Sequence, residues 1–291
     1  MKVLFVINPR SGRKEEVTLE QQIAGKAEEL AFEYDICPMV DGNIVKKVAK
    51  KIYSYKPDIV AAAGGDGTVN LLASILQNSG TPLLIIPSGS ANGMAKELDI
   101  RSIPAAFELL ETGVRRQIDL IRINGRICIH LADVGPNARI VKNFERAGNR
   151  GIPGYAKFFL REIFLEKHYR FIIRYGHDQL ALKAVSLTFA NASKYGTGAV
   201  INPHGILDDG YFELVIIRPF PRIKLPGIVW KMFRNKLQTS EYVEVIRCSS
   251  ATVSSNKRTT LQIDGEVIGK VKNINAEILP LALTVIVPPV A

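Results

Sequence analysis

The stretch VAAAGGDGTVN, residues 60–70, decides the fold because it joins a strand-like segment to a helix-like one through glycines. Residues 58–65 form a short apolar run, and residues 68–77 have helical spacing. Gly64, Gly65 and Gly67 exceed the needs of an ordinary strand-to-helix turn, so we interpret them as space for phosphate at the helix start. Asp66 would repel a phosphate, which leaves two explanations: a metal ion between the two, or a role in ordering the loop.

The alternation of strand and helix continues over the first 120 residues. We expect strands at 2–7, 32–37, 58–65 and 82–87. We expect helices at 18–30, 41–55, 68–77 and 103–112, with Asp41 and Ser102 as caps of the second and the last. This order predicts an amino-terminal α/β domain over residues 1–120, with a mostly parallel sheet covered by helices on both faces.

Beyond about residue 120 the pattern changes to strands with short turns. Asn124-Gly125 predicts a hairpin, and one helix is expected at 153–167. Further strands are expected at 170–176, 181–193, 211–218, 242–255, 259–268 and 275–288. The pattern predicts an antiparallel β-sandwich domain over residues 121–278. The apolar tail, about 279–291, either closes the sandwich or returns to pair with the first sheet.

Composition narrows the range of partners. The net charge of +10 favours an anionic partner, such as a phosphorylated substrate or an anionic lipid, but no sequence signature of a nucleic-acid-binding protein accompanies it. No apolar stretch is long enough to span a bilayer, and the amino terminus is too short in its apolar part for a signal peptide. Three scattered cysteines predict free thiols in the cytoplasm, and the four histidines show no metal-ligand spacing.

Two more loops share the design of residues 64–68. NPRSG (8–12) follows the first expected strand, and PSGSANG (87–93) follows the fourth. Loops at the carboxyl ends of parallel strands gather at one edge of the sheet, where ligands bind. The sequence lacks the Walker pattern GxxxxGK[ST], and Asn70 stands where a Rossmann fingerprint has its third glycine. These loops therefore predict a site for nucleotide phosphates that is neither a Walker loop nor a Rossmann loop.

In this order and with these gaps, the three motifs resemble the lipid kinase family that contains diacylglycerol kinases and sphingosine kinases. Downstream, NPHGILDDGYFELVII (202–217) resembles the Asp-Asp-Gly segment of that family, and LQIDGE (261–266) resembles its Asp-Gly-Glu motif. The resemblance covers nearly the whole chain. NAD kinases share the GGDGT loop, but the later motifs separate the two families.

The resemblance implies a nucleotide domain and a β-sandwich lipid-substrate domain, with the active site in the cleft between them. It implies ATP as co-substrate, bound by the following residues: Asn8, Pro9, Arg10, Ser11, Gly12, Gly64, Gly65, Asp66, Gly67, Thr68, Asn70, Ser90 and Asn92. It implies Glu266 as general base, with Asp264 and Asp66 as further catalytic carboxylates. It also implies Mg²⁺, held at the Asp-Asp-Gly turn by Asp209 and the carbonyl of Tyr211, with Asp208 beside them.

Two positions depart from the family pattern. Gly93 stands where diacylglycerol kinases usually have Asp, and Asn137 stands where the family often has an Asp. We therefore expect an ATP-dependent kinase that phosphorylates the hydroxyl of a membrane lipid, such as a sphingoid base or diacylglycerol. The alternatives are an NAD-kinase-like enzyme with a soluble substrate, and a non-catalytic homologue that binds nucleotide or lipid.

A lipid substrate requires access to a membrane. In residues 226–238, helical spacing puts Trp230, Lys231 and Arg234 on the face opposite Ile228, Val229 and Met232. This arrangement predicts transient docking on anionic membranes, although a helix packed along the sandwich would show the same pattern. A second apolar segment, with Phe158 and Phe159, could instead line an acyl-chain pocket. We expect a cytoplasmic protein that is peripheral at the membrane, and leave open whether it forms a homodimer.

Overall fold

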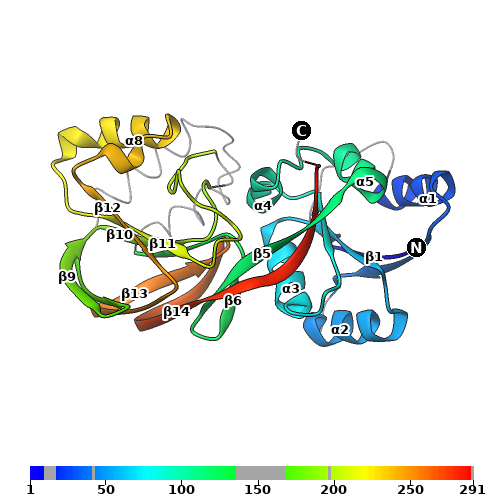
Figure 1. Ribbon diagram of the computed structural model, residues 1–291, viewed down its shortest axis with the longest axis horizontal. Coiled ribbons are helices and arrows are strands. Elements are labelled where there is room, and N and C mark those ends of the chain that lie inside the picture. Colours follow the sequence, from blue (N-terminus) through cyan, green and yellow to red (C-terminus); the bar gives the residue numbers. More distant parts are fainter. Residues whose placement is uncertain (10–17, 41–42, 136–167, 196–197, 290–291) are drawn as a thin grey trace. The chain divides into compact units, whose positions relative to one another are not determined.

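The computed structural model of the chain describes residues 1–9, 18–40, 43–135, 168–195 and 198–289. The chain forms two compact units, and Figure 1 labels their elements. Unit 1 combines residues 1–118 with 282–291, and unit 2 comprises residues 119–281. Each unit is described by itself.

Unit 1 is built on a parallel sheet, as the sequence predicts. Strand β1 (Lys2–Ile7) lies between β2 (Glu33–Pro38) and β3 (Ile59–Gly64), and β3 pairs with β4 (Leu83–Pro87). The last strand of the chain, β14 (Glu266–Val287), adds its end to this sheet, where Val285 pairs in parallel with Leu83. Of the two alternatives for the apolar tail, the structure therefore has the return to the first sheet.

Helices cover both faces of the unit 1 sheet (Figure 1). They are α1 (Leu19–Glu29), α2 (Ile44–Tyr55), α3 (Asp66–Leu76), α4 (Gly93–Glu97) and α5 (Ile103–Thr112). Ser102 caps α5 as expected, because its side chain accepts a hydrogen bond from the amide of Ala105. The cap of α2 is Asn43, which accepts from the Lys46 amide, so the expectation of Asp41 at this position is wrong. The short helix α4 was not expected.

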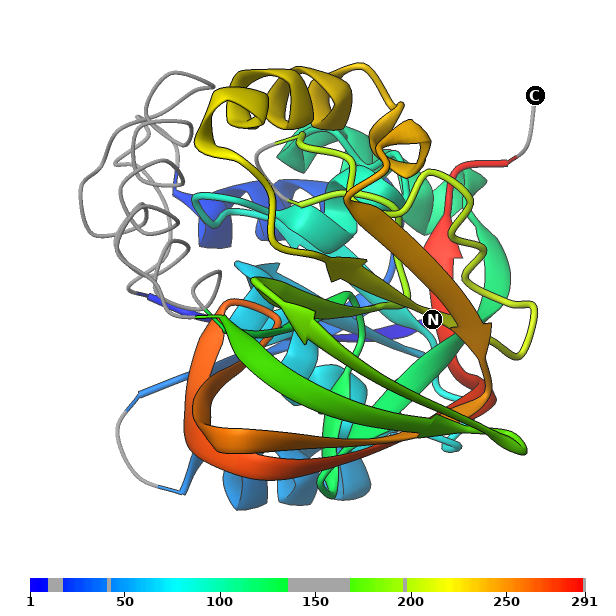
Figure 2. The ribbon, with the colours of Figure 1, turned by 90° about the vertical axis from the view of Figure 1, so that its left-hand side faces the viewer.

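Unit 2 consists mainly of antiparallel strands, which Figure 2 shows as a strongly curved sheet. Its strands are the second half of β5 (Val114–Ile123), β6 (Arg126–Cys128), β7 (Leu131–Val134), β8 (Tyr169–Tyr175), β9 (Asp178–Ala184), β10 (Ser186–Ala190), β11 (Phe212–Ile217), β12 (Val243–Cys248) and β13 (Ser250–Ile263), together with most of β14. The segment expected as one strand at 181–193 contains both β9 and β10. The helix expected at 153–167, with Phe158 and Phe159, lies outside the described residues.

Two hydrophobic cores stabilise unit 2. One contains Phe171, Phe189 and Phe212, and the other lies under helix α8 (Leu225–Phe233). Short 3-10 turns, η1 (Arg222–Lys224) and η2 (Leu237–Thr239), flank this helix. Strands packed on apolar side chains in this way agree with the predicted sandwich.

Two sequence-level expectations concern the chain as a whole. All three cysteines are free thiols, as predicted, and all three are buried. Among the described residues, no helix combines the length and the apolar character needed to cross a membrane.

Candidate functional site

Three loops of unit 1 begin side by side at the carboxyl ends of adjacent strands. In the parallel register, Ile7 at the end of β1 lies beside Ala63 of β3, and Gly64 at the end of β3 lies beside Pro87 of β4. The first loop starts with Asn8, whose amide donates to the Ala63 carbonyl at 3.0 Å. The predicted residues Asn8 and Pro9, 64–68, and 88–92 thus share one edge of the sheet, while Arg10, Ser11 and Gly12 lie outside the described residues.

The three glycines of the second loop have different roles. A Cβ at Gly64 would overlap the hydroxyl of Thr68, and Gly65 lies against the backbone of Gly89 in the third loop. Only Gly67 has open space around its Cα. Gly64 and Gly65 therefore serve close packing between segments of the protein, and space for phosphate stays a prediction for Gly67.

Asp66 fastens the third loop to the second. Its carboxylate oxygens accept hydrogen bonds from the backbone amides of Gly93 and Met94, at 3.0 and 3.1 Å. Such charge-assisted bonds are among the stronger hydrogen bonds in proteins. Of the two explanations for a carboxylate beside phosphates, the structure shows the ordering of the loop. Asp66 thus positions the third loop, and its expected role as a catalytic carboxylate stays a prediction.

Asn92 also stabilises the third loop from inside. Its side chain accepts from the Gly89 amide and donates to the Gly89 carbonyl, both at 2.9 Å. The backbone of Asn92 is left-handed, with φ at 51°, a conformation that asparagine adopts more readily than most residues. Asn92 therefore shapes the loop, whereas Ser90 is exposed at its tip.

The remaining nucleotide-site predictions of the second loop fall on helix α3. This helix starts at Asp66, two residues earlier than expected, with Gly65 as its N-cap. Thr68 is buried, so its hydroxyl does not face solvent, while Asn70 is half-buried. No hydrogen bond within the described part of the chain uses the backbone amides of Gly65, Asp66 or Gly67. The start of α3 thus presents amides beside an exposed glycine, an arrangement that suits a phosphate group.

In unit 2, the Asp-Gly-Glu motif is the turn of a hairpin. Ile263 of β13 pairs with Glu266 of β14, and Asp264 and Gly265 occupy the two turn positions with φ of 47° and 87°. Positive φ at both positions is typical of the tight type I′ turn. Glu266 is exposed, whereas Asp264 is only 7% exposed. The two carboxylates of the motif therefore have different surroundings.

Asp264 holds the segment that connects β6 with β7. Its carboxylate accepts hydrogen bonds from the amides of Ile129, His130 and Leu131 at 2.9, 3.0 and 3.0 Å. The Cys128 thiol also points to it, at 3.4 Å, and burial raises the pKa of that thiol well above its usual value, so it stays a donor. A carboxylate surrounded by four donors positions the backbone, and a catalytic role of Asp264 stays a prediction.

A buried aspartate that the sequence analysis missed fixes the Asp-Asp-Gly turn. Asp119 of β5 is fully buried, and its carboxylate accepts from the amides of Gly210 and Leu281, both at 2.7 Å. Asn191 connects this aspartate to the Asp264 segment, because its side-chain amide donates to the carbonyls of Asp119 and Ile129 at 2.8 and 2.9 Å. One hydrogen-bond network thus joins the Asp-Asp-Gly turn and the Asp-Gly-Glu turn within unit 2.

The Asp-Asp-Gly turn does not fit the expected Mg²⁺ site. One oxygen of Asp209 accepts from the Tyr211 amide at 3.0 Å, and the other lies 2.7 Å from the guanidinium of Arg247. That guanidinium also stacks over the Tyr211 ring at 4.3 Å. In the described part of the chain, Asp208 and Asp209 join no group of three or more side chains suited to a metal. Arg247 supplies the positive charge that this turn needs, so we derive no chemical step through a metal here.

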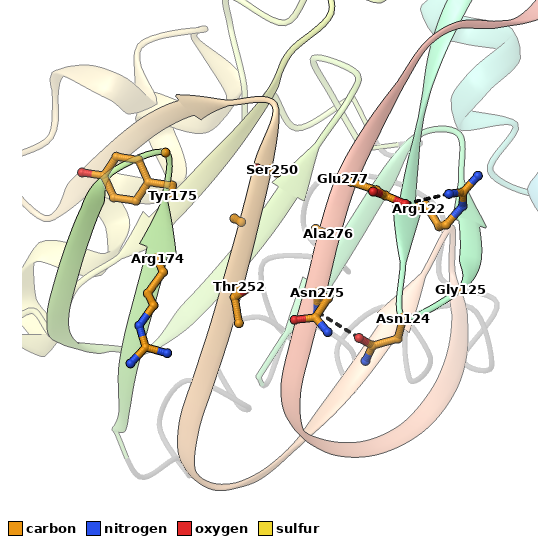
Figure 3. Close-up of a pocket in the computed structure, with 12 residues that line it drawn as sticks. Arg122, Asn124, Gly125, Arg174, Tyr175, Ser250, Thr252, Asn275, Ala276 and Glu277 are labelled. Atoms are coloured by element: carbon orange, nitrogen blue, oxygen red, sulfur yellow. Dashed lines mark hydrogen bonds and ion pairs between the residues drawn. The ribbon is translucent and has the colours of Figure 1, made fainter.

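A pocket of about 520 Å³ lies on unit 2 (Figure 3), and no residue of these turns lines it. Arg122 and Glu277 form an ion pair at 2.6 Å on one side of it, and the Asn275 amide donates to the Asn124 side chain at 2.9 Å. Arg174 lies across β13 from them. None of the predicted site residues lines this pocket, so its size alone does not make it the candidate site.

Comparisons with known proteins agree with this organisation. Residues 2–123 match the model of the diacylglycerol kinase catalytic domain, and residues 133–287 match that of the YegS C-terminal NAD kinase beta sandwich-like domain. The chain is 26% identical to a diacylglycerol kinase of Staphylococcus saprophyticus over 91% of its own length and 89% of that protein. It is 27% identical to an uncharacterised protein of Synechocystis sp. over 79% of its length, but spans only 54% of that longer protein.

A solved structure shares the fold over the whole chain. A diacylglycerol kinase structure from Bacillus anthracis superposes with a TM-score of 0.77 at 18% identity, covering 99% of this chain and 97% of the other. The two matching domain models lie in the order that the motifs require and together account for nearly all described strands. The chain therefore belongs to the diacylglycerol kinase family of lipid kinases.

Proposed function

We propose that this lipid kinase transfers the γ-phosphate of ATP to the hydroxyl of a membrane lipid, with Glu266 as general base. The observation that carries the proposal is the start of α3, where Gly67 is exposed and the backbone amides of residues 65–67 have no acceptor within the described part of the chain, next to the third loop that Asp66 holds. Phosphoryl transfer depends on positioning and on charge neutralisation, and a preformed cradle of amides provides both for the phosphates. The active site in a cleft between the two domains, which the resemblance implies, stays a prediction.

The proposed reaction forms one bond and breaks one. The lipid hydroxyl oxygen attacks the γ-phosphorus, the bond from that phosphorus to the β–γ bridging oxygen breaks, and ADP leaves. The hydroxyl proton passes to the carboxylate of Glu266. The exposure of Glu266 supports this role, because the other acid of the turn, Asp264, already accepts from three amides.

Mg²⁺ is proposed only as a companion of the nucleotide. Protein-bound Mg²⁺ is usually held by substrate phosphates together with one or two carboxylates. Asp66 is the carboxylate nearest to the exposed amides in sequence, but both its oxygens accept backbone hydrogen bonds. Mg²⁺ would therefore enter as part of the nucleotide substrate and neutralise phosphate charge there.

A panel of acceptors with radiolabelled ATP tests the proposal. We expect label in a lipid product when sphingoid base or diacylglycerol is dispersed in detergent, and none in NAD. Labelling of NAD without any lipid would support the NAD-kinase-like alternative instead. ATP binding with no labelled product from any acceptor would support the non-catalytic alternative, which the departures at Gly93 and Asn137 motivate.

The contact between the second and third loops is tested by Gly89→Ala. The added Cβ would overlap the backbone of Gly65 and lie 2.8 Å from Asn92 Oδ1, so the two loops must separate. We expect ATP affinity, measured by calorimetry, to fall by about tenfold or more, since misplaced donors lose much of their effect. Gly25→Ala on α1 is the matched control: its Cβ meets nothing, and it should keep ATP affinity. Equal affinities in the two variants would contradict the role of these loops.

Substitution of the two acids of the Asp-Gly-Glu turn should have different effects, one on turnover and the other on stability. Glu266→Gln removes an exposed acid, so turnover should fall by about 10²–10⁴ while the free energy of unfolding stays nearly constant. Asp264→Asn leaves buried amides poorly paired, so the free energy of unfolding should drop by about 2–3 kcal/mol. Denaturant unfolding and steady-state kinetics measure both. Near-normal turnover in Glu266→Gln would remove it as the base.

A further inference from the structure

Helix α8 and the turn before it carry an outward surface that the proposed chemistry does not use. The 3-10 turn η1 leads directly into α8, so residues spaced by four, seven and eleven lie on one side. Ile223, Gly227, Trp230 and Arg234 have this spacing, and all four are exposed. Ile223 is 86% exposed and Trp230 is 55% exposed, two large apolar side chains in water. We call Ile223, Lys224, Trp230 and Arg234 the α8 patch.

The opposite face of the helix fixes the orientation of this patch. Leu225, Ile228 and Met232 are buried in one of the two cores of unit 2, with Val215 and Ile217 of β11. The Met232 carbonyl accepts from the Val200 amide at 3.1 Å. The patch therefore faces outward from a helix that is already packed, and binding to it would not require this helix to fold.

The charged residues of the segment that carries the patch are all basic. The segment 219–240 contains no acidic residue and includes these cations: Arg222, Lys224, Lys231, Arg234 and Lys236. Arg234 lies over the Trp230 ring at 5.6 Å, while the Lys231 ammonium donates to the Thr239 carbonyl at 3.0 Å. Lys231 is thus partly engaged within the protein, a refinement of the expectation that it faces outward with Trp230.

We propose that the α8 patch docks this protein on the surface of an anionic lipid bilayer. Tryptophan is enriched at membrane interfaces, and a partly apolar helix surrounded by cations suits anionic headgroups. Ile223 and Trp230 are roughly 10 Å apart along the helix, so both can enter one shallow layer of the interface. The inference rests on the proposed function only in its choice of partner, because a membrane-lipid substrate brings the enzyme to a bilayer.

Another exposed aromatic side chain provides a matched control. Tyr53 is 82% exposed on α2 in unit 1, among the lysines of that helix. Lys51 of α2 forms an ion pair with Asp35, so acidic side chains accompany this surface. Both helices thus carry an exposed aromatic residue and cations with no acid of their own, but on α2 the cation Lys51 is paired with Asp35 of the neighbouring strand β2. Tyr53→Ser should leave membrane binding unchanged.

Trp230 is the only tryptophan of the chain, so its fluorescence reports directly on the patch. The full chain would be mixed with vesicles of phosphatidylcholine alone, or of equal parts phosphatidylcholine and phosphatidylglycerol. With the anionic vesicles we expect binding in sedimentation, a shift of the emission to shorter wavelengths, and quenching by lipids brominated on the acyl chains. With phosphatidylcholine alone, and at high salt, binding should be much weaker.

Three variants give the expected size of the effect. Ile223→Ser should lower the partition coefficient about tenfold, since a side chain that is exposed in water loses its apolar burial in the bilayer. Lys224→Ala should lower it roughly fivefold, as expected for one cation near an anionic surface. Tyr53→Ser should match the wild-type protein. Thermal unfolding of each variant confirms that the fold is retained.

Several results would overturn the proposal. Binding to anionic vesicles without a change in Trp230 fluorescence would place the docking surface elsewhere, and no binding would exclude docking. A fluorescence shift that depends on protein concentration without vesicles would make the patch a contact between copies of the chain. Phosphorylation of detergent-dispersed lipid separates the two proposals. Kinase activity without binding to vesicles would contradict the docking proposal alone. Binding to vesicles without kinase activity would contradict the proposed function alone.

Discussion

Backbone amides held by aspartate carboxylates determine the shape of the candidate site in each unit. Asp66 accepts from the amides of Gly93 and Met94 in unit 1, and Asp264 accepts from three consecutive amides in unit 2. Asp119 accepts from two more amides, at Gly210 and Leu281. A carboxylate with several amide donors is strongly favoured over an unpaired one in a buried position. Loops without regular secondary structure therefore obtain fixed positions.

This use of carboxylates has a consequence for the chemistry. Acids that hold the backbone have part of their acceptor capacity occupied by amides, which leaves less of it for a substrate proton or a metal. Asp209 is engaged in the same way by an amide and by Arg247. Of the acids singled out from the sequence as catalytic, Glu266 alone is exposed. The chain belongs to a family of lipid kinases, and the hydrogen bonds of Asp66 and Asp264 are the reason that we propose Glu266 as the general base.

The sequence predicts the elements of unit 1 well because their hydrophobic periodicity is local, and strand β1 and helix α5 have the expected bounds. It predicts the motifs but not the roles of their acids, because those roles depend on distant partners. Asp119 is the only acid of strand β5, and its amide donors are 91 and 162 residues away. Asp264 stands in a turn that reads as solvated, yet its donors come from a segment more than 130 residues earlier.

Amide hydrogen exchange tests the central claim most directly. If carboxylates hold these loops, the amides of Ile129, His130 and Leu131 should exchange slowly although they lie outside long strands, and the amide of Gly176 in the exposed β8–β9 turn should exchange fast. In Asp264→Asn, exchange at the three amides should become fast while the strands of unit 1 stay protected. Exchange at these amides as fast as at Gly176 in the wild-type protein would contradict the account.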